Sequence, residues 1–278
     1  MQHSEYEWKS SDGLKIYGQE WKPEGQVKAA IAMVHGLGEH SGRYGHVAEA
    51  FTTKGYSLTA FDLRGHGKSE GVRGHAASYD ALMKDISQNV NLAKEHFPGV
   101  PVFIYGHSLG GNLALYYCLT QNPDLKGAIV TSPGLGTADP VPPAKLALGK
   151  LLYNLLPATQ MDNGLQKSGL SRDPEVEKKY SADPLVHPKI SARWALDLIN
   201  NGKYIIEHAA EFPIPLLLMQ GSGDYIVSPP MTKAFANAAP LSKITFKLWE
   251  GFYHELHNEP EKAQVLKTMT DWLDQELK

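Results

Sequence analysis

The amino-acid sequence predicts a doubly wound α/β fold built on a mostly parallel sheet of eight strands, and three observations support this. Six short apolar runs are continuously hydrophobic rather than alternating, which is typical of parallel strands covered on both faces. Segments with helical periodicity separate several of these runs. An N-terminal hairpin adds two strands as an antiparallel edge. Strands that alternate with helices predict helices on both faces of the sheet.

The first two strands are predicted from a turn motif. Residues 6–9 and 14–21 flank Ser10-Ser11-Asp12-Gly13, and an Asp-Gly pair between two strand-like runs is a strong hairpin signal. The six apolar runs that follow are rich in Ile, Val, Leu and Phe, are bounded by Gly, Pro or Asp, and cover residues 29–34, 57–61, 101–105, 127–131, 214–219 and 244–248.

The clearest predicted helix covers residues 78–97. Its apolar residues form one stripe at spacings of three and four, with Ser78 as the expected N-cap and Pro98-Gly99 as the stop. Residues 109–121 and 261–277 also have the pattern of helices.

Residues 134–212 break the alternation of strands and helices. This segment is rich in proline at its start, shows short helical pieces and no clear strand, and is too long for a loop. We therefore expect one core of residues 1–133 and 213–278, interrupted by a helical lid at 134–212. Within it, the leucines of 148–156 form an apolar helical face near Lys145 and Lys150, which fits contact with a lipid surface and packing on its own protein equally well.

Composition narrows the function classes. The 278 residues are 42% hydrophobic and 21% charged, which excludes disorder, collagen and coiled coil. The 27 basic and 30 acidic residues give a net charge of −3, so there is no basic surplus for a nucleic-acid partner. A lone cysteine, Cys118, excludes an intramolecular disulfide, and neither a signal peptide nor an apolar run of ~20 residues is present. The expected location is the cytoplasm.

The sequence Gly106-His107-Ser108-Leu109-Gly110 is the candidate nucleophile motif. It follows a predicted strand and opens a predicted helix, which is the context in which Gly-x-Ser-x-Gly lifts a serine above a sheet. The alternative is a purely structural glycine turn, and the placement favours the nucleophile.

A serine nucleophile needs a base and an orienting carboxylate, in the chain order Ser, acid, His for this architecture. Asp224 follows the run 214–219, and His254 follows the run 244–248. An Asp beside a Gly is commonly a turn residue, and His257 is a second histidine in the same region, but the joint order and spacing favour Asp224 and His254. Asp62, at the end of another strand, is interpreted as a structural residue of the next turn.

The oxyanion of an acyl transfer needs backbone donors. The amide of Leu109 directly follows the nucleophile, and the amide of Leu37 lies in the glycine-containing loop after the run 29–34. His35 is expected to pack beneath that loop.

No histidine pair has the spacing and accompanying ligand of a metal site, and no glycine-rich dinucleotide motif follows the first parallel strand. The sequence thus predicts no metal and no other cofactor.

The stretch His-Gly-Leu-Gly-Glu-His-Ser-Gly-Arg-Tyr at 35–44 resembles a signature of monoacylglycerol lipases and related lysophospholipases of the α/β-hydrolase superfamily. Four further stretches agree, at 64–71, 106–111, 217–224 and 250–257. The resemblance implies an α/β-hydrolase fold, the triad Ser108, Asp224 and His254, and the oxyanion amides of Leu37 and Leu109.

The resemblance also implies a polar pocket for a glycerol head group, surrounded by Glu39, Arg43, His107, Tyr180 and His257. The expected activity is hydrolysis of monoacylglycerols to glycerol and fatty acid through an acyl-serine, with a small lipid ester as substrate and peripheral lipid contact through the lid. The alternatives are a lysophospholipase, a broad carboxylesterase or aminopeptidase-like hydrolase, and an inactive ligand-binding protein with this fold.

Overall fold

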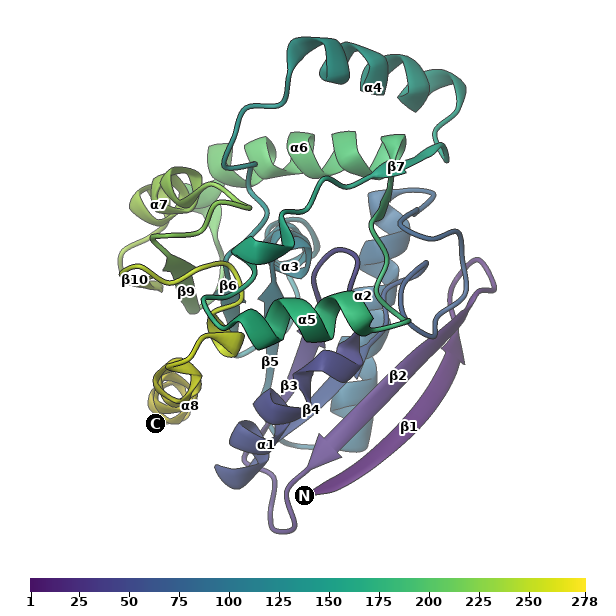
Figure 1. Cartoon of the computed structure of the whole chain (residues 1–278). Coiled ribbons are helices and arrows are strands. Elements are labelled where there is room, and N and C mark those ends of the chain that lie inside the picture. The colour runs from purple at the N-terminus through teal and green to yellow at the C-terminus, as the bar shows by residue number, and fades with distance from the viewer.

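The computed structural model describes all 278 residues and contains the predicted sheet of eight strands. The strand order is β1-β2-β4-β3-β5-β6-β9-β10, and every neighbouring pair from β4 to β10 is parallel. The β1–β2 and β2–β4 pairs are antiparallel, so the hairpin forms one edge, as predicted (Figure 1). The strands are β1 Gln2–Lys9, β2 Lys15–Lys22, β3 Ala29–Val34, β4 Tyr56–Phe61, β5 Val102–His107, β6 Gly127–Thr131, β9 Leu216–Gly221 and β10 Ile244–Trp249.

Helices cover both faces of the sheet. One face packs against α1 (Gly45–Thr53) and α8 (Lys262–Glu276). The other packs against α2 (Tyr79–His96), α3 (Leu109–Gln121) and α7 (Pro229–Ala238). Alternate residues of β3 enter the two cores, with Ile31 on one face and Ala32 on the other, both fully buried. Burial on both faces explains why these strands are continuously apolar.

The boundaries of α2 follow from its sequence. The Ser78 hydroxyl accepts a hydrogen bond from the Ala81 amide at 3.1 Å and so caps the first turn. The helix ends at His96, immediately before Phe97 and the Pro98-Gly99 pair. The sequence did not predict α1 and α7, which are only 9 and 10 residues long.

Residues between β6 and β9 form an insertion, which contains α4 (Pro143–Leu155), α5 (Pro174–Ala182) and α6 (Ala192–Glu207). In Figure 1, α4 runs beside α6, and α6 in turn packs on α3. The prediction that this segment contains no strand is wrong, because β7 (Gln160–Asp162) and β8 (Lys189–Ser191) form an antiparallel pair. Strands of three residues are too short to produce a periodic signal. Four 3₁₀ turns complete the chain, at Ser41–Tyr44, Lys167–Gly169, Ala209–Glu211 and Leu256–Asn258.

The leucine face of α4 is turned to solvent. The exposed fractions of Leu148, Leu151, Leu155 and Leu156 are 53%, 55%, 68% and 61%. The sequence left two alternatives for this face, and the one in which it packs on its own protein is wrong for these four side chains. None of the helices combines the length and the apolar character that a transmembrane segment needs.

Candidate active site

The site forms where parallel strands end along one edge of the sheet. The loops after β3, β5, β9 and β10 carry Leu37, Ser108, Asp224 and His254 respectively. Because these strands run in the same direction, their carboxyl ends lie at the same edge, where ligands of α/β sheets bind. The topology thus brings together side chains that are 146 residues apart in the sequence.

The turn between β5 and α3 holds Ser108 in an unusual backbone conformation, with φ of 55° and ψ of −117°. Positive φ is rare for a residue with a side chain, so the turn is strained. Its flanking glycines are required sterically. A Cβ on Gly110 would overlap the Val34 carbonyl oxygen of β3, and a Cβ on Gly106 would overlap the Gly110 carbonyl. The motif therefore has the strand-to-helix geometry expected of it.

Ser108, His254 and Asp224 form a hydrogen-bonded line. His254 Nε2 lies 2.8 Å from Ser108 Oγ, and His254 Nδ1 lies 2.8 Å from Asp224 Oδ2. With its proton on Nδ1, the ring donates to the carboxylate and accepts from the serine hydroxyl. This is the arrangement in which a histidine can take the serine proton.

Opposing effects set the ionisation of this pair. Burial disfavours the charged forms of both groups, but the two are in direct contact. The Asp224 carboxylate outweighs burial and raises the pKa of His254 above its usual 6.5. His254 and the amides of Ile226 and Val227 likewise outweigh burial and lower the pKa of Asp224. Asp224 is therefore a carboxylate, and His254 is a stronger base than an ordinary histidine.

Three polar residues to which the sequence analysis gave no role, Gln220, Thr232 and Ser132, fix the positions of Asp224 and His254. The Gln220 side-chain amide donates to Asp224 Oδ2 at 2.9 Å, and the Thr232 hydroxyl donates to Gln220 Oε1 at 3.0 Å. The Ser132 hydroxyl donates to the His254 carbonyl oxygen at 2.7 Å. A glutamine at the end of a continuously apolar strand is a signal that could have been used, because a buried amide needs partners.

The predicted oxyanion donors border the site from two sides. Leu109 is the first residue of α3, where an amide has no acceptor within its own helix. Leu37 lies in the loop after β3, and its amide has no acceptor among the hydrogen bonds of the structure. Glu39 stabilises this loop by accepting from the Gly36 amide and the Tyr44 hydroxyl, both at 2.7 Å. Both amides are free to donate, and their catalytic role remains a prediction.

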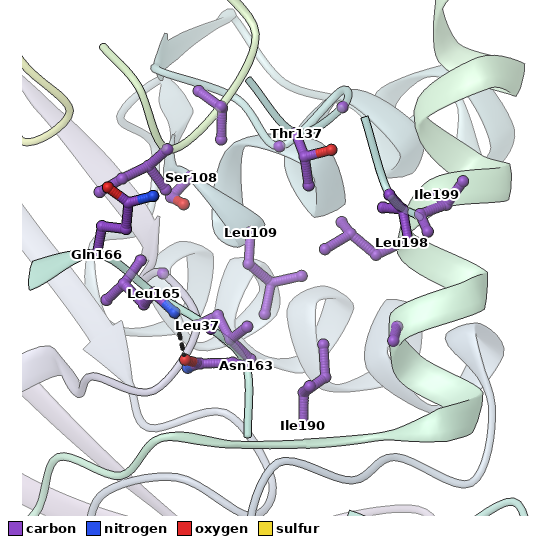
Figure 2. A pocket seen from close by; sticks show the side chains of 18 of the residues that line it. Leu37, Ser108, Leu109, Thr137, Asn163, Leu165, Gln166, Ile190, Leu198 and Ile199 are labelled. Carbon is purple, nitrogen blue, oxygen red and sulfur yellow. Dashed lines mark hydrogen bonds between the residues drawn. The ribbon is translucent and has the colours of Figure 1, made fainter. Parts of the chain in front are cut away.

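A cavity of about 320 Å³ opens beside Ser108. Figure 2 shows Leu109 between Ser108 and the side chains of Leu198 and Ile199 of the insertion, with Leu37 and Ile190 below Leu109 in the view. Core and insertion thus both supply its apolar lining.

Of the five predicted head-group residues, three line this cavity and two do not. Glu39, His107 and Tyr180 are on its wall, whereas Arg43 and His257 lie behind it. His257 is fully buried among Tyr44, His46 and His107. The structure therefore gathers all five residues in one region, but only three face the space next to Ser108.

Arg43 is held between two carboxylates. Its Nη1 donates to Glu39 Oε2 and Glu255 Oε1, and its Nη2 donates to Glu255 Oε2 at 2.8 Å. The guanidinium carbon lies 4.8 Å from the centre of the Tyr180 ring. Glu255, which directly follows His254, is 2% exposed and lines the cavity, yet sequence reasoning gave it no role.

Three further side chains of the region, those of His107, His35 and Asp62, are buried and hydrogen-bonded within the protein. Burial, followed by the neighbouring His254, lowers the pKa of His107 to about 4, and its Nδ1 lies 3.0 Å from the Thr131 hydroxyl. His35 Nε2 accepts from the Leu63 amide at 2.9 Å. Asp62 accepts from the Ser41 and Lys68 amides, both at 2.8 Å, and so joins two loops. Asp62 and His35 thus have the structural roles expected of them.

Comparison with known proteins agrees with this geometry. The family model described as "Serine aminopeptidase, S33" matches residues 25–261. An uncharacterized abhydrolase domain-containing protein of Dictyostelium discoideum is 39% identical over 96% of this chain, which spans 28% of that protein's length. A monoacylglycerol lipase of Mycolicibacterium smegmatis is 32% identical over 97% of this chain and 96% of its own.

Among solved structures, the monoacylglycerol lipase of Paleococcus ferrophilus superposes with a TM-score of 0.85 at 32% identity, covering 94% of this chain and 99% of that one. The sheet and its helices therefore have the α/β-hydrolase fold, and the chain belongs to the serine aminopeptidase, S33 family of α/β-hydrolases.

Proposed function

We propose that the protein is a serine hydrolase of carboxylic esters, with monoacylglycerols as its substrate class. The observation that carries the proposal is the relay from Ser108 Oγ to His254 to Asp224, with 2.8 Å at each step, beside a largely apolar cavity. The names of the Mycolicibacterium and Paleococcus relatives support the choice of ester.

In the first step, His254 takes the proton of Ser108 while the serine oxygen attacks the ester carbonyl. The amides of Leu37 and Leu109 stabilise the negative charge on the carbonyl oxygen. Protonated His254 then gives its proton to the departing glycerol oxygen, which leaves an acyl-serine.

In the second step, water attacks the acyl-serine. His254 takes a proton from the water, and the same two amides stabilise the second oxyanion. Collapse of this intermediate returns the proton to Ser108 and releases the fatty acid. No metal or other cofactor takes part in either step.

The two ends of the cavity suit the two parts of such a substrate. The acyl chain fits the apolar part lined by Leu198, Ile199 and their neighbours (Figure 2). The glycerol fits the polar part, where Glu39, His107 and Tyr180 offer hydrogen-bonding groups.

Covalent labelling tests the nucleophile. A fluorophosphonate probe should label the wild type and not Ser108→Ala, and this substitution should lower the rate of ester hydrolysis by at least ~10³-fold. Ser222→Ala removes another hydroxyl of the same region, which only accepts a hydrogen bond from the Gly251 amide, and should be labelled as the wild type is. Undiminished labelling of Ser108→Ala would exclude Ser108 as the nucleophile, and an unlabelled wild type would favour a ligand-binding protein.

A substrate panel tests the ester class. Monoacylglycerol, lysophosphatidylcholine, diacylglycerol and an aminoacyl amide should be compared by kcat/KM with the same acyl group where chemistry allows. Monoacylglycerol should rank first. Faster turnover of the phospholipid or the amide would replace the proposed substrate with that class.

We further propose that the insertion at 134–212 is a lid that rests on lipid surfaces through the leucine face of α4. Three exposed leucines on one short helix, a fourth directly after it, and Lys145 and Lys150 on the same helix have the character of an interfacial element. The lid covers the cavity with residues of α4 and α6. Contact of α4 with a lipid surface would therefore bring the cavity close to the lipid molecules of that surface.

A further inference from the structure

Glu255 is a buried residue of the cavity wall that has no role in the proposed mechanism. The triad is complete without it, and the Arg43 guanidinium already has a carboxylate partner in Glu39. Glu255 nevertheless lies on the cavity wall beside His254, and both its oxygens accept from Arg43. A second buried carboxylate on one guanidinium changes the charge of this part of the site.

The charges of the polar end add up to an excess of one negative charge. Glu39 and Glu255 are each 3% exposed or less in their side chains, and Arg43, at 11%, is the single cation between them. Ionisation of Glu39 is opposed by burial, but Arg43 and His107 outweigh it and lower its pKa to about 2. Burial also opposes the charge of Arg43, while Glu255 and Glu39 together raise its pKa further.

The side chain of Tyr180 lies on the cavity wall, next to these charged groups. Its ring faces Arg43, yet its pKa is raised by burial and then by Glu39 and Glu255, against the smaller opposite effect of Arg43. Two buried carboxylates and a single guanidinium therefore lie next to this ring. His107, the other polar group here, has a lowered pKa and adds no positive charge at neutral pH.

Both terminal nitrogens of Arg43 are also bonded to carboxylates. Nη1 is shared between the two carboxylates and Nη2 is bonded to Glu255, while the flat face is against Tyr180. A phosphate in the polar end would meet the carboxylates of Glu39 and Glu255, which line the cavity, whereas the Arg43 guanidinium lies behind them, although arginine is otherwise a preferred phosphate partner.

We propose that Glu255 is a specificity-determining residue, which adds a second carboxylate beside Arg43 and so gives the cavity wall an excess negative charge, with the result that the site rejects esters whose alcohol carries a negative charge. The inference rests on the proposed function and deepens it, since it assigns the accepted leaving alcohol to the neutral and cationic classes. Glycerol satisfies the rule, and a phosphorylated glycerol does not.

The test compares butyrate esters that share one acyl group and are soluble, so that lipid binding plays no part. For the wild type, kcat/KM for monobutyrylglycerol should exceed that for butyryl glycerol phosphate by at least about tenfold, as expected for one like-charge contact in a partly buried site. Glu255→Gln should reduce this preference about tenfold, whatever its effect on the overall rate. A wild-type ratio near one, or an unchanged ratio in Glu255→Gln, overturns the proposal.

Two matched variants separate charge from shape. Glu255→Asp keeps the carboxylate and should keep the preference, and Glu250→Gln removes an exposed carboxylate of the same loop and should also keep it. Loss of the preference in Glu250→Gln would assign it to the overall charge of the surface and overturn the role of Glu255.

A second comparison needs only the wild type and decides the matter if Glu255→Gln does not fold. Butyrylcholine and its uncharged isostere 3,3-dimethylbutyl butyrate differ in charge alone, and the cationic ester should have the higher kcat/KM. Equal values, or a preference for the neutral ester, overturn the proposal. If the protein hydrolyses none of these esters, the proposed function itself is overturned. If it hydrolyses monobutyrylglycerol but does not discriminate between charged and neutral esters, only the role of Glu255 is overturned.

Discussion

His254 must be neutral to accept the Ser108 proton, so the pH dependence of hydrolysis reports its ionisation. Burial lowers the pKa of His254, but Asp224 outweighs it and the net shift is upward from 6.5. A raised pKa means that the protonated, inactive form persists to higher pH. Activity should therefore be lost as pH falls through a value above 6.5.

The prediction is that kcat/KM of the wild type declines about tenfold per pH unit below an acid limb centred above 6.5. Asp224→Asn removes the charge that raises the pKa, so its acid limb should move down, with a loss of about 10⁴-fold in kcat as in serine proteases. Asp271→Asn, which removes a carboxylate of α8 paired with Lys267, should leave the profile unchanged. An acid limb that is the same in wild type and Asp224→Asn would contradict the pairing.

Sequence order was enough to select Ser108, Asp224 and His254, because strand ends and chain order restrict where such residues can lie. It was not enough for Gln220, Ser132 and Glu255. Their roles depend on the direction of each side chain after a turn, which no pattern of neighbouring residues encodes. Arg43 illustrates the same limit, since its position behind the cavity wall follows from a partner 212 residues away.

At the level of elements, α4 is unusual because three of its leucines, Leu148, Leu151 and Leu155, are more than half exposed. Replacement of Leu151 and Leu155 by serine should weaken binding to phospholipid vesicles by about tenfold or more, since each exposed leucine loses its apolar contact with lipid. Vesicle co-sedimentation measures the binding, and hydrolysis of a soluble butyrate ester should not change.

The matched control is Leu241→Ser, because Leu241 is 87% exposed but lies in the turn between α7 and β10. It should bind vesicles as the wild type does. Equal binding by the α4 variant and the wild type would leave the leucine face without a lipid partner.

The strands of the sheet were predictable to within two residues, apart from the longer β1. Burial on both faces leaves a continuous apolar run in the inner strands β3, β4, β5, β6 and β9, whereas the hairpin strands were found from their turn. The short helices α1 and α7 were not predictable, because 9 or 10 residues hold too few apolar positions to define a stripe. The strands β7 and β8 depend on a partner distant in sequence, and the role of 134–212 as a lid stays a prediction.

For the molecule as a whole, the insertion and the core are joined at the site itself. The His254 and Glu255 amides donate to the Gly169 and Leu170 carbonyl oxygens, at 3.2 and 2.7 Å. The His187 amide donates to the Gly38 carbonyl oxygen at 2.9 Å, next to the oxyanion loop. The insertion therefore supports the loops that carry His254, the proposed base, and Leu37, a proposed oxyanion donor, and it also roofs the cavity.

The positive φ of Ser108 affects the thermal stability of the whole protein. A residue with a Cβ is strained by about 1–3 kcal/mol in such a conformation, whereas glycine adopts it freely. Ser108→Gly should therefore melt at a higher temperature than Ser108→Ala, as measured by calorimetry. At Ser181, inside helix α5, the order should be the reverse, because glycine destabilises a helix relative to alanine.

An equal or lower melting temperature for Ser108→Gly would mean that the turn carries no strain. If Ser108→Gly melts at the higher temperature, the proposed nucleophile is also a residue at which the fold is less stable than it could be. Selection for thermal stability alone would then favour glycine at position 108, which would give an inactive protein. The serine at this position would be retained because the activity requires it, although it lowers the stability of the fold.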